Sequence, residues 1–151
     1  MKLLFIFLGI VVIILITGII WARTAKRPQL GVVHNQLSAI PDKPNCVSTQ
    51  SGNPKQKMPP IAYSSTQLEA QKKLITIITQ LPRATLLDQK SGYIWVVYRS
   101  AFFGFPDDVE FMFDDNQKVI HFRAAARLGH SDLGVNKKRM ATISQQFAES
   151  P

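Results

Sequence analysis

A run of 19 uncharged residues opens the chain, from Leu3 to Trp21, and only two glycines and one threonine interrupt its apolar character. As an α-helix rising about 1.5 Å per residue, this run would be about 28 Å long, close to the roughly 30 Å hydrocarbon core of a bilayer. Trp21 ends the run, where an indole favours the headgroup level, and basic residues follow at once. The pattern predicts a transmembrane anchor over residues 1–22.

A cleaved signal peptide is the competing interpretation of the same run. Its apolar core is normally shorter, and a small-x-small cleavage site should follow it. The next four residues, Ala22 to Ala25, have the wrong spacing for such a site and place the charge of Arg23 inside it. Cys46 lies 25 residues beyond Trp21, too far along for the cysteine of a lipid-attachment signal. We therefore interpret the segment as an uncleaved signal-anchor.

Residues 23–65 have a different pattern, because proline recurs among polar residues and prevents a regular helix. We interpret them as a Pro-rich extended linker that leads into the start of the domain. Six basic residues stand against one acid here, which is +5 of the total charge. The first three, Arg23, Lys26 and Arg27, would meet anionic lipid headgroups, each contributing about 1 kcal/mol near a membrane surface.

Residues 66–151 alternate between helical and strand periods. Thr66 and Glu69 fit a capping box at the start of an amphipathic helix that Pro82 ends. Aromatic and β-branched stretches then predict strands over residues 84–88, 93–99, 109–114 and 119–124. A last helix is expected from about Asn136 to Ala148. This order predicts an α+β domain, a small antiparallel sheet of three to four strands with two helices packed on one face.

Composition limits the class of protein. The 151 residues allow one domain of ordinary size, and a 46% hydrophobic content excludes a disordered polyelectrolyte. The single cysteine excludes a disulfide framework and a zinc site of several thiolates, and we predict no cofactor and no metal. A net charge of +8 would suit nucleic acid. The basic residues are dispersed and form no recognition motif, so we expect no nucleic-acid partner.

Five acidic residues surround the third predicted strand, and two of them, Asp107 and Asp108, are adjacent. Together with Glu110, on the polar face of that strand, they have the oxygen ligands that a divalent cation requires. The spacing of a calcium-binding loop is absent, however. We therefore favour the alternative, in which the acids form salt bridges across the sheet to arginines: Arg99, Arg123 or Arg127.

The loop from Arg127 to Asn136 carries the second candidate site. Asn136 is a suitable N-cap for the last helix, and the free N–H groups there would attract an anion, helped by basic neighbours such as Lys137. His130 beside Asp132 would serve as an oriented base. An ordinary loop-to-helix connection is the simpler interpretation. The candidate binding cluster comprises Asp107, Asp108, Glu110, Arg123, Arg127, His130, Ser131, Asp132 and Asn136.

Cys46 is the candidate thiol. A nucleophilic cysteine needs a nearby base or a helix N-terminus to lower its pKa. Three histidines are present, at positions 34, 121 and 130, but no spacing places one of them beside Cys46. The alternative is a buried, small apolar side chain or a thiol tucked beneath the Pro-rich segment.

Several separated motifs resemble the domain-of-unknown-function family 1499 of bacteria and plastids. They are Arg27-Pro28, Leu30 to Val32, Pro44 to Ser48, Phe105 to Phe111 and Arg123 to Arg139. The resemblance covers about residues 27–147 and implies a domain of that extent, without implying a reaction. The chain departs from the family pattern Arg-Ser-x-Ser-Arg, because alanines fill the positions between Arg123 and Arg127.

Two functions follow from these features. We favour a single-pass, membrane-anchored binding or accessory module, whose α+β domain takes an anionic small molecule, a lipid headgroup or a protein partner. Its other partner would be the lipid bilayer. The alternative is a hydrolytic enzyme that uses Cys46 or an Asp/His/Arg cluster. The chain lacks a GxSxG elbow, an HExxH pair, a P-loop and a dinucleotide glycine motif, which favours the binding module.

The side of the membrane that the domain occupies is a separate question. Lys2 precedes the apolar run and three basic residues follow it, so the positive-inside rule alone would leave the domain in the cytoplasm. Long domains cross regardless of flanking charge, and a short N-terminus with one lysine is typical of an export-type anchor. Members of the similar family often follow such N-termini. We therefore expect an inner-membrane protein whose domain is extracytoplasmic, in the periplasm.

Overall fold

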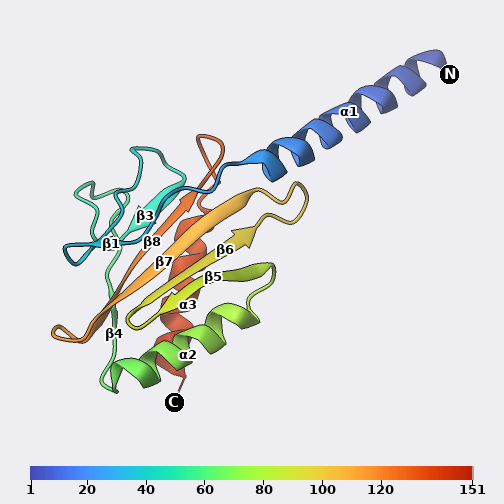
Figure 1. Cartoon of the computed structure of the whole chain (residues 1–151). Helices are drawn as coiled ribbons and strands as arrows, with labels where there is room; N and C mark the ends of the chain where they lie inside the picture. Colours follow the sequence, from blue (N-terminus) through green and yellow to red (C-terminus); the bar gives the residue numbers. More distant parts are fainter. Residues whose placement is uncertain (151) are drawn as a thin grey trace.

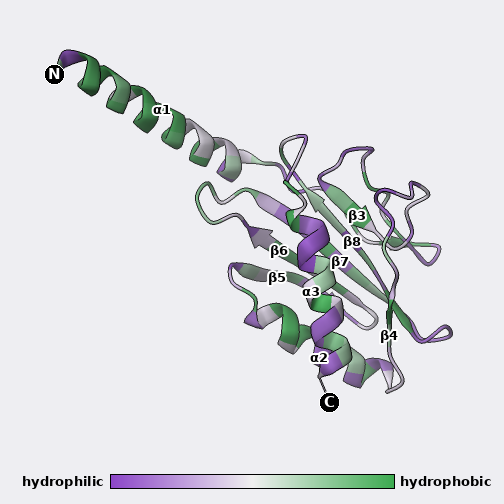
Figure 2. Cartoon of the chain, turned by 180° about the vertical axis from the view of Figure 1, so that it is seen from behind, coloured by the Kyte–Doolittle hydropathy of each residue, from purple (hydrophilic) through white to green (hydrophobic). Residues whose placement is uncertain are grey.

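The computed structural model describes residues 1–150 and begins with one long helix, α1 (Lys2–Thr24). Figure 1 shows that α1 extends away from the rest of the molecule. Its most apolar 18-residue window has a mean hydropathy of 3.3 and no buried residue, and Figure 2 shows apolar colouring along most of the helix. By length and composition, α1 is apolar enough to cross a membrane.

A six-stranded antiparallel sheet forms the centre of the remaining chain. The strand order is β3-β8-β7-β6-β5, and β4 also pairs with β8. The strands are β3 (Cys46–Ser48), β4 (Ile61–Ala62), β5 (Ala84–Lys90), β6 (Tyr93–Arg99), β7 (Pro106–Asp114) and β8 (Val119–Ala126). A separate hairpin consists of β1 (Val32–Val33) and β2 (Gln36–Leu37).

The prediction of an α+β domain is confirmed, but the predicted size of the sheet, three to four strands, is wrong. The Pro-rich segment supplies two further strands. β3 pairs with β8 through Cys46 opposite Ala125, and β4 pairs with β8 through Ile61 opposite Ile120. Strands of three and two residues are too short to show a period of two, so the sequence pattern did not reveal them.

Two helices, α2 (Gln67–Gln80) and α3 (Val135–Glu149), pack on one face of the sheet (Figure 1). The predicted capping box is present at the start of α2, where Thr66 Oγ1 accepts from the Glu69 N–H and Glu69 Oε2 accepts from the Thr66 N–H. The apolar positions of β7 face the helices, and each side chain buried there stabilises the fold by about 1.5–3 kcal/mol. The core includes Leu74, Ile78, Val109, Phe111, Phe122, Met140 and Ile143.

The opposite face of the sheet is covered by the chain that follows α1. Leu37 packs on Tyr93, Trp95 and Met112, and the guanidinium of Arg27 lies 5.4 Å from the centre of the Trp95 ring. This part of the Pro-rich segment therefore buries sheet residues that would otherwise face water. The sheet has apolar partners on both faces.

The end of the sheet from which α1 leaves is built by two loops, and we call it the α1 end. One loop, residues 100–105, joins β6 to β7, and the other, residues 127–134, joins β8 to α3. Their bases are tied together by the Arg127 N–H, which donates to the carbonyl of Pro106 at 3.0 Å. Figure 1 shows both loops projecting toward the base of α1.

Candidate functional site

The strand alternation of β7 separates the adjacent acids Asp107 and Asp108, which point to opposite faces of the sheet. On the face away from the helices, Asp108 accepts two hydrogen bonds from Arg127, from Nε and from Nη2, each at 2.7 Å. It also accepts a hydrogen bond from Trp95 Nε1 at 2.9 Å. Because Asp108 is 1% exposed, this ion pair lies in the protein interior.

Glu110 and Arg123 form a second buried pair on the same face. The hydroxyl of Tyr93 donates to Glu110 Oε1 at 2.6 Å, and Arg123 Nη1 lies 3.6 Å from Glu110 Oε2. Within residues 1–150, Glu110 Oε2 and the Nε and Nη1 atoms of Arg123 are buried without a hydrogen-bond partner. Burial is the main cause that raises the pKa of the Glu110 carboxyl. This pair is therefore incompletely satisfied, unlike that of Asp108.

Asp107 belongs to a third group, on the helix-covered face. Arg139 of α3 donates to Asp107 Oδ2 from Nη2 at 2.9 Å and to Asn136 Oδ1 from Nη1 at 2.6 Å. Its guanidinium also lies 4.5 Å from the centre of the Tyr98 ring. Burial is the main cause that raises the pKa of Asp107. Through these contacts Arg139 joins α3 to β7.

The N-cap of α3 is Gly134, so the prediction of Asn136 as the N-cap is wrong, and the side chain of Asp132 binds backbone N–H groups at this end of the helix. Asp132 accepts from the N–H of Gly134 at 3.0 Å and from the N–H of Asn136 at 2.8 Å. Gly134 has a φ of 77°, a left-handed conformation that glycine adopts without strain. The side chain of Asn136 is buried instead, and its Nδ2 donates to the carbonyl of Asn45.

The other two members of the predicted cluster lie on the surface of the loop. His130 and Ser131 are exposed, and Ser131 Oγ accepts from the Leu133 N–H at 3.2 Å. The cluster is thus divided into two buried ion pairs on one face, a third group with Asn136 on the other face, and a loop at the α1 end. The structure does not bring these residues together in one open cleft.

Cys46 is a buried thiol held by neutral groups. Its Sγ donates to the carbonyls of Pro41 and Lys43, each at 3.0 Å, and Gln56 Nε2 lies 3.1 Å from it. Burial, the largest influence, raises the pKa of Cys46 above its ordinary value. A histidine elsewhere on the sheet, His121, has its Nδ1 3.1 Å from Thr49 Oγ1 rather than beside the thiol.

We expect Cys46 to react about 100-fold more slowly with a water-soluble disulfide reagent in the folded protein than in urea. At pH 8 the raised pKa keeps the group as the unreactive thiol, and burial denies access. Release of the coloured thiolate product over time measures the rate. Free cysteine in the same buffer is the control. Equal rates in the folded and unfolded protein would show that Cys46 is not a buried, protected thiol.

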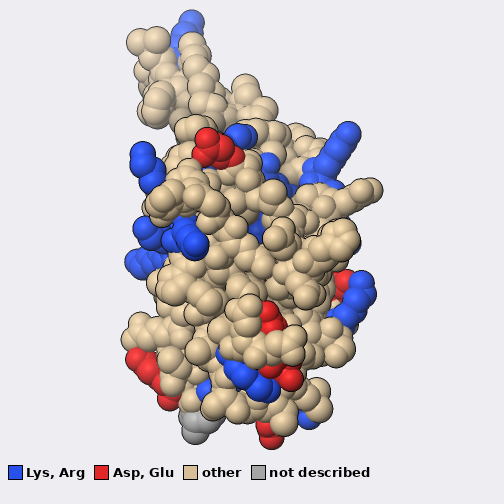
Figure 3. Space-filling view, turned by 90° about the vertical axis from the view of Figure 1, so that its left-hand side faces the viewer, with Lys and Arg blue, Asp and Glu red and all other residues tan. Residues whose placement is uncertain are grey.

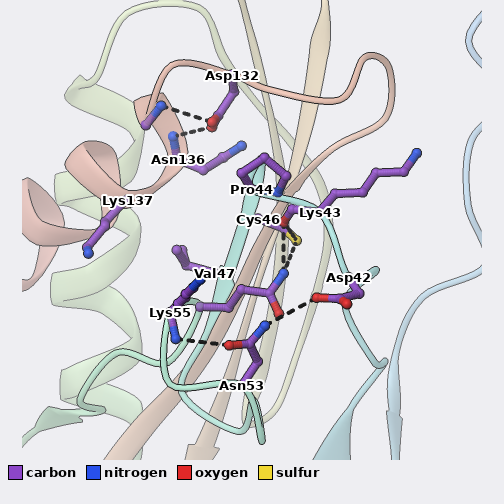
Figure 4. Close-up of a pocket in the computed structure, with 12 residues that line it drawn as sticks. Asp42, Lys43, Pro44, Cys46, Val47, Asn53, Lys55, Asp132, Asn136 and Lys137 are labelled. Atoms are coloured by element: carbon purple, nitrogen blue, oxygen red, sulfur yellow. Dashed lines mark hydrogen bonds between the residues drawn. The ribbon is translucent and has the colours of Figure 1, made fainter.

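A pocket of about 450 Å³ lies between the segment before β3 and the start of α3 (Figure 4). Three lysines, Lys43, Lys55 and Lys137, contribute to its lining, and all three are exposed. Its two acids already have hydrogen-bond donors, since Asp42 accepts from Asn53 Nδ2 at 3.2 Å and Asp132 accepts from backbone N–H groups at the start of α3. Figure 4 shows Lys137 on the α3 side of the pocket and Lys43 on the opposite side. The lining therefore carries three ammonium groups that form no ion pair with its two carboxylates.

Asp132, Asn136, Lys137 and Cys46 all line this pocket. The sequence placed the first three in one candidate anion site at the start of the last helix, and it left Cys46 apart from them. It missed Lys43 and Lys55 as site residues, because they lie more than 75 residues before α3 and no local spacing marks them. Figure 3 shows the wider setting. Basic side chains predominate in the half of that face nearer α1, and acidic side chains lie mostly in the far half.

A comparison with known families agrees with the extent of this domain. The family described as "Protein of unknown function (DUF1499)" matches the chain over residues 36–147, which confirms the resemblance found in the sequence. The matched region includes all six strands of the sheet and α2, and it ends within α3. No curated protein matches the chain.

Proposed function

We propose that this protein, which belongs to the DUF1499 family, is a membrane-anchored binding module that holds an anionic ligand in the pocket between β3 and α3. The observation that carries the proposal is the set of three exposed lysines around a pocket whose two acids already have partners. The ligand class is a phosphate or a similar oxyanion, either on a free small molecule or on a lipid headgroup.

The charges of the pocket are distributed unevenly between paired and unpaired groups. Asp132 is bound to the backbone at the start of α3, where the helix dipole already favours a negative charge. Lys43, Lys55 and Lys137 form none of the salt bridges found within residues 1–150. Three uncommitted ammonium groups attract an oxyanion at modest desolvation cost, because their flexible side chains remain in contact with water.

Location supports the same ligand class. α1 would cross the inner membrane, and the domain would lie in the periplasm, close to the bilayer. The basic residues Arg23, Lys26 and Arg27, which follow the apolar run, are exposed and suit anionic headgroups. Asp132, which lines the pocket, belongs to the loop at the α1 end. A lipid headgroup in the leaflet next to that end would therefore lie close to the pocket.

The hydrolytic alternative has less support. Cys46 lines the same pocket, but its thiol donates to two backbone carbonyls and burial raises its pKa. Of the candidate bases, His130 is exposed on the loop and does not line the pocket. A nucleophile needs a base within hydrogen-bond reach, and the hydrogen-bond partners of the Cys46 thiol are two backbone carbonyls and the amide of Gln56, none of which is a base.

Replacing Lys43 or Lys137 with glutamine is expected to weaken anion binding about two- to fivefold each, the effect of removing one partly screened charge. The full chain would be placed in phosphatidylcholine nanodiscs, and inorganic phosphate would be titrated while the amide signals of the pocket residues are followed. A second set of nanodiscs containing phosphatidylglycerol tests the lipid as the source of the phosphate.

Lys72→Gln on the exposed surface of α2 is the matched control, since it removes one lysine away from the pocket. If inorganic phosphate shifts the amide signals of the pocket residues, the ligand is a soluble phosphate compound. If only phosphatidylglycerol shifts them, the ligand is a lipid headgroup. If neither probe shifts the pocket signals, or if Lys72→Gln weakens binding as much as Lys43→Gln, the proposed site is wrong.

A further inference from the structure

Two large apolar side chains are almost fully exposed at the α1 end of the domain. Among the described residues that follow α1, Phe102 and Leu133 are the most exposed large hydrophobic residues, at 90% and 94%. Phe102 lies in the loop between β6 and β7, and Leu133 lies in the loop between β8 and α3. Exposed apolar groups gathered on one end mark a contact surface, because each is unfavourable in water.

The β6–β7 loop also contacts α1 directly. The ring of Phe105 lies edge-on to Trp21, with centroids 5.8 Å apart, and Phe103 stacks on Phe105 at 5.2 Å. The Phe103 ring lies against Gly18, where a Cβ atom would come within 2.7 Å of it. The absence of a side chain at Gly18 therefore lets the loop pack closely on the helix.

These contacts set the depth of the loop relative to the apolar run. Gly18 precedes Trp21 by three residues, which is about 4.5 Å further into the span. An indole favours the headgroup level of a bilayer, so the ring beside Gly18 lies at the outer edge of the hydrocarbon. Phe102, the neighbour of Phe103, is then at the same boundary, and its side chain is exposed.

We infer that Phe102 and Leu133 insert into the leaflet from which α1 emerges, so that the domain has a second membrane contact besides its helix. The inference rests on the anchoring part of the proposed function. The surrounding charge fits a lipid surface, since Arg99 at the base of the β6–β7 loop is exposed and its Nη1 donates to the Gly104 carbonyl at 3.0 Å. Exposed Arg23 and Lys26 lie on the chain just after the apolar run.

A bilayer fits this surface better than a second protein, because the loop packs on α1 at a level that lipid would already occupy. The consequence for the proposed function is an orientation. With both loops against the membrane, the domain would stand on its α1 end, and the pocket beside Asp132 would face the headgroup region.

The test introduces one cysteine at a time into the full chain, which keeps Cys46, and labels it with an environment-sensitive fluorophore. Phe102→Cys and Leu133→Cys report the loops, Trp21→Cys reports the anchor, and Leu68→Cys is the matched control. Leu68 is an exposed apolar residue, and its neighbour Gln67 donates to Ser91 in the turn between β5 and β6, at the opposite end of the sheet. The wild-type protein measures any background labelling of buried Cys46.

The proteins are reconstituted in phosphatidylcholine and phosphatidylglycerol vesicles that contain nitroxide-labelled lipids. Probes at 21, 102 and 133 are expected to be quenched several-fold more strongly than the probe at 68. Quenching at 21 without quenching at 102 and 133 overturns this inference and leaves the anchor intact. A blue shift at 102 without lipid quenching indicates a second copy or a protein partner and also overturns it. No quenching at 21 refutes the anchor itself.

Discussion

Replacing Asp108 with alanine is expected to lower the free energy of unfolding by about 3–5 kcal/mol, because a buried charge then loses its partner. Asp108 is 1% exposed, and the Arg127 side chain is 10% exposed. Without the carboxylate, the guanidinium loses two hydrogen bonds of 2.7 Å, and Trp95 Nε1 loses its acceptor. Urea unfolding of the full chain in detergent, followed by near-ultraviolet circular dichroism, measures the change.

A surface ion pair supplies the matched control. Asp88 lies 2.9 Å from Lys90, but the two side chains are 34% and 72% exposed, so Asp88→Ala should cost less than about 1 kcal/mol. The double variant Asp108→Ala with Arg127→Met should recover part of the loss, because it removes both buried charges. A loss for Asp108→Ala no larger than that for Asp88→Ala would show that the buried pair is not formed.

Deleting Lys2–Thr24 is expected to move the protein from the membrane fraction to the soluble fraction of cells that produce it. The deleted segment has a mean hydropathy of 3.3 over its most apolar window, and each Leu, Ile or Val near a bilayer centre contributes about −0.3 to −0.6 kcal/mol. Two loop side chains cannot replace that free energy. Fractionation with salt and carbonate washes measures the distribution, and circular dichroism shows whether the truncated chain is folded.

The control for this deletion keeps the apolar character of the span. Replacing Ile10, Ile13, Ile14 and Ile16 with leucine preserves the hydrophobicity of α1, so this variant should remain with the membrane. A folded, truncated chain that stays in the washed membrane pellet would mean that α1 is not the anchor.

The sequence patterns correctly predicted structural features that depend only on residues close together in the chain. The capping box of Thr66 and Glu69 needs only a spacing of three, and the alternation of Val109, Phe111 and Phe113 needs only a period of two. Both are present in the structure. The α+β class and the family follow from the order of such segments and from separated motifs, and they are confirmed as well.

Features that depend on distant segments were not predictable in the same way. The pocket exists because the chain around Lys43 and Lys55 folds against the start of α3, and no spacing encodes that contact.

The capping of α3 illustrates a local error. Gly134, in a left-handed conformation, is the N-cap, and Asp132 accepts from its N–H and from that of Asn136, whose side chain is buried. Asn136 was chosen because its side chain suits an N-cap, whereas a glycine that adopts a positive φ fills that position.

Whether α1 holds the domain at the bilayer can be read from the intact mass of the protein recovered from the membrane and soluble fractions of cells that make the full chain. We expect a chain that retains α1 and is found in the membrane fraction, because the apolar helix holds the domain at the bilayer. A soluble chain that begins near Arg27 would contradict it, since the domain would then have been released from the helix that places its loops and its pocket at the membrane.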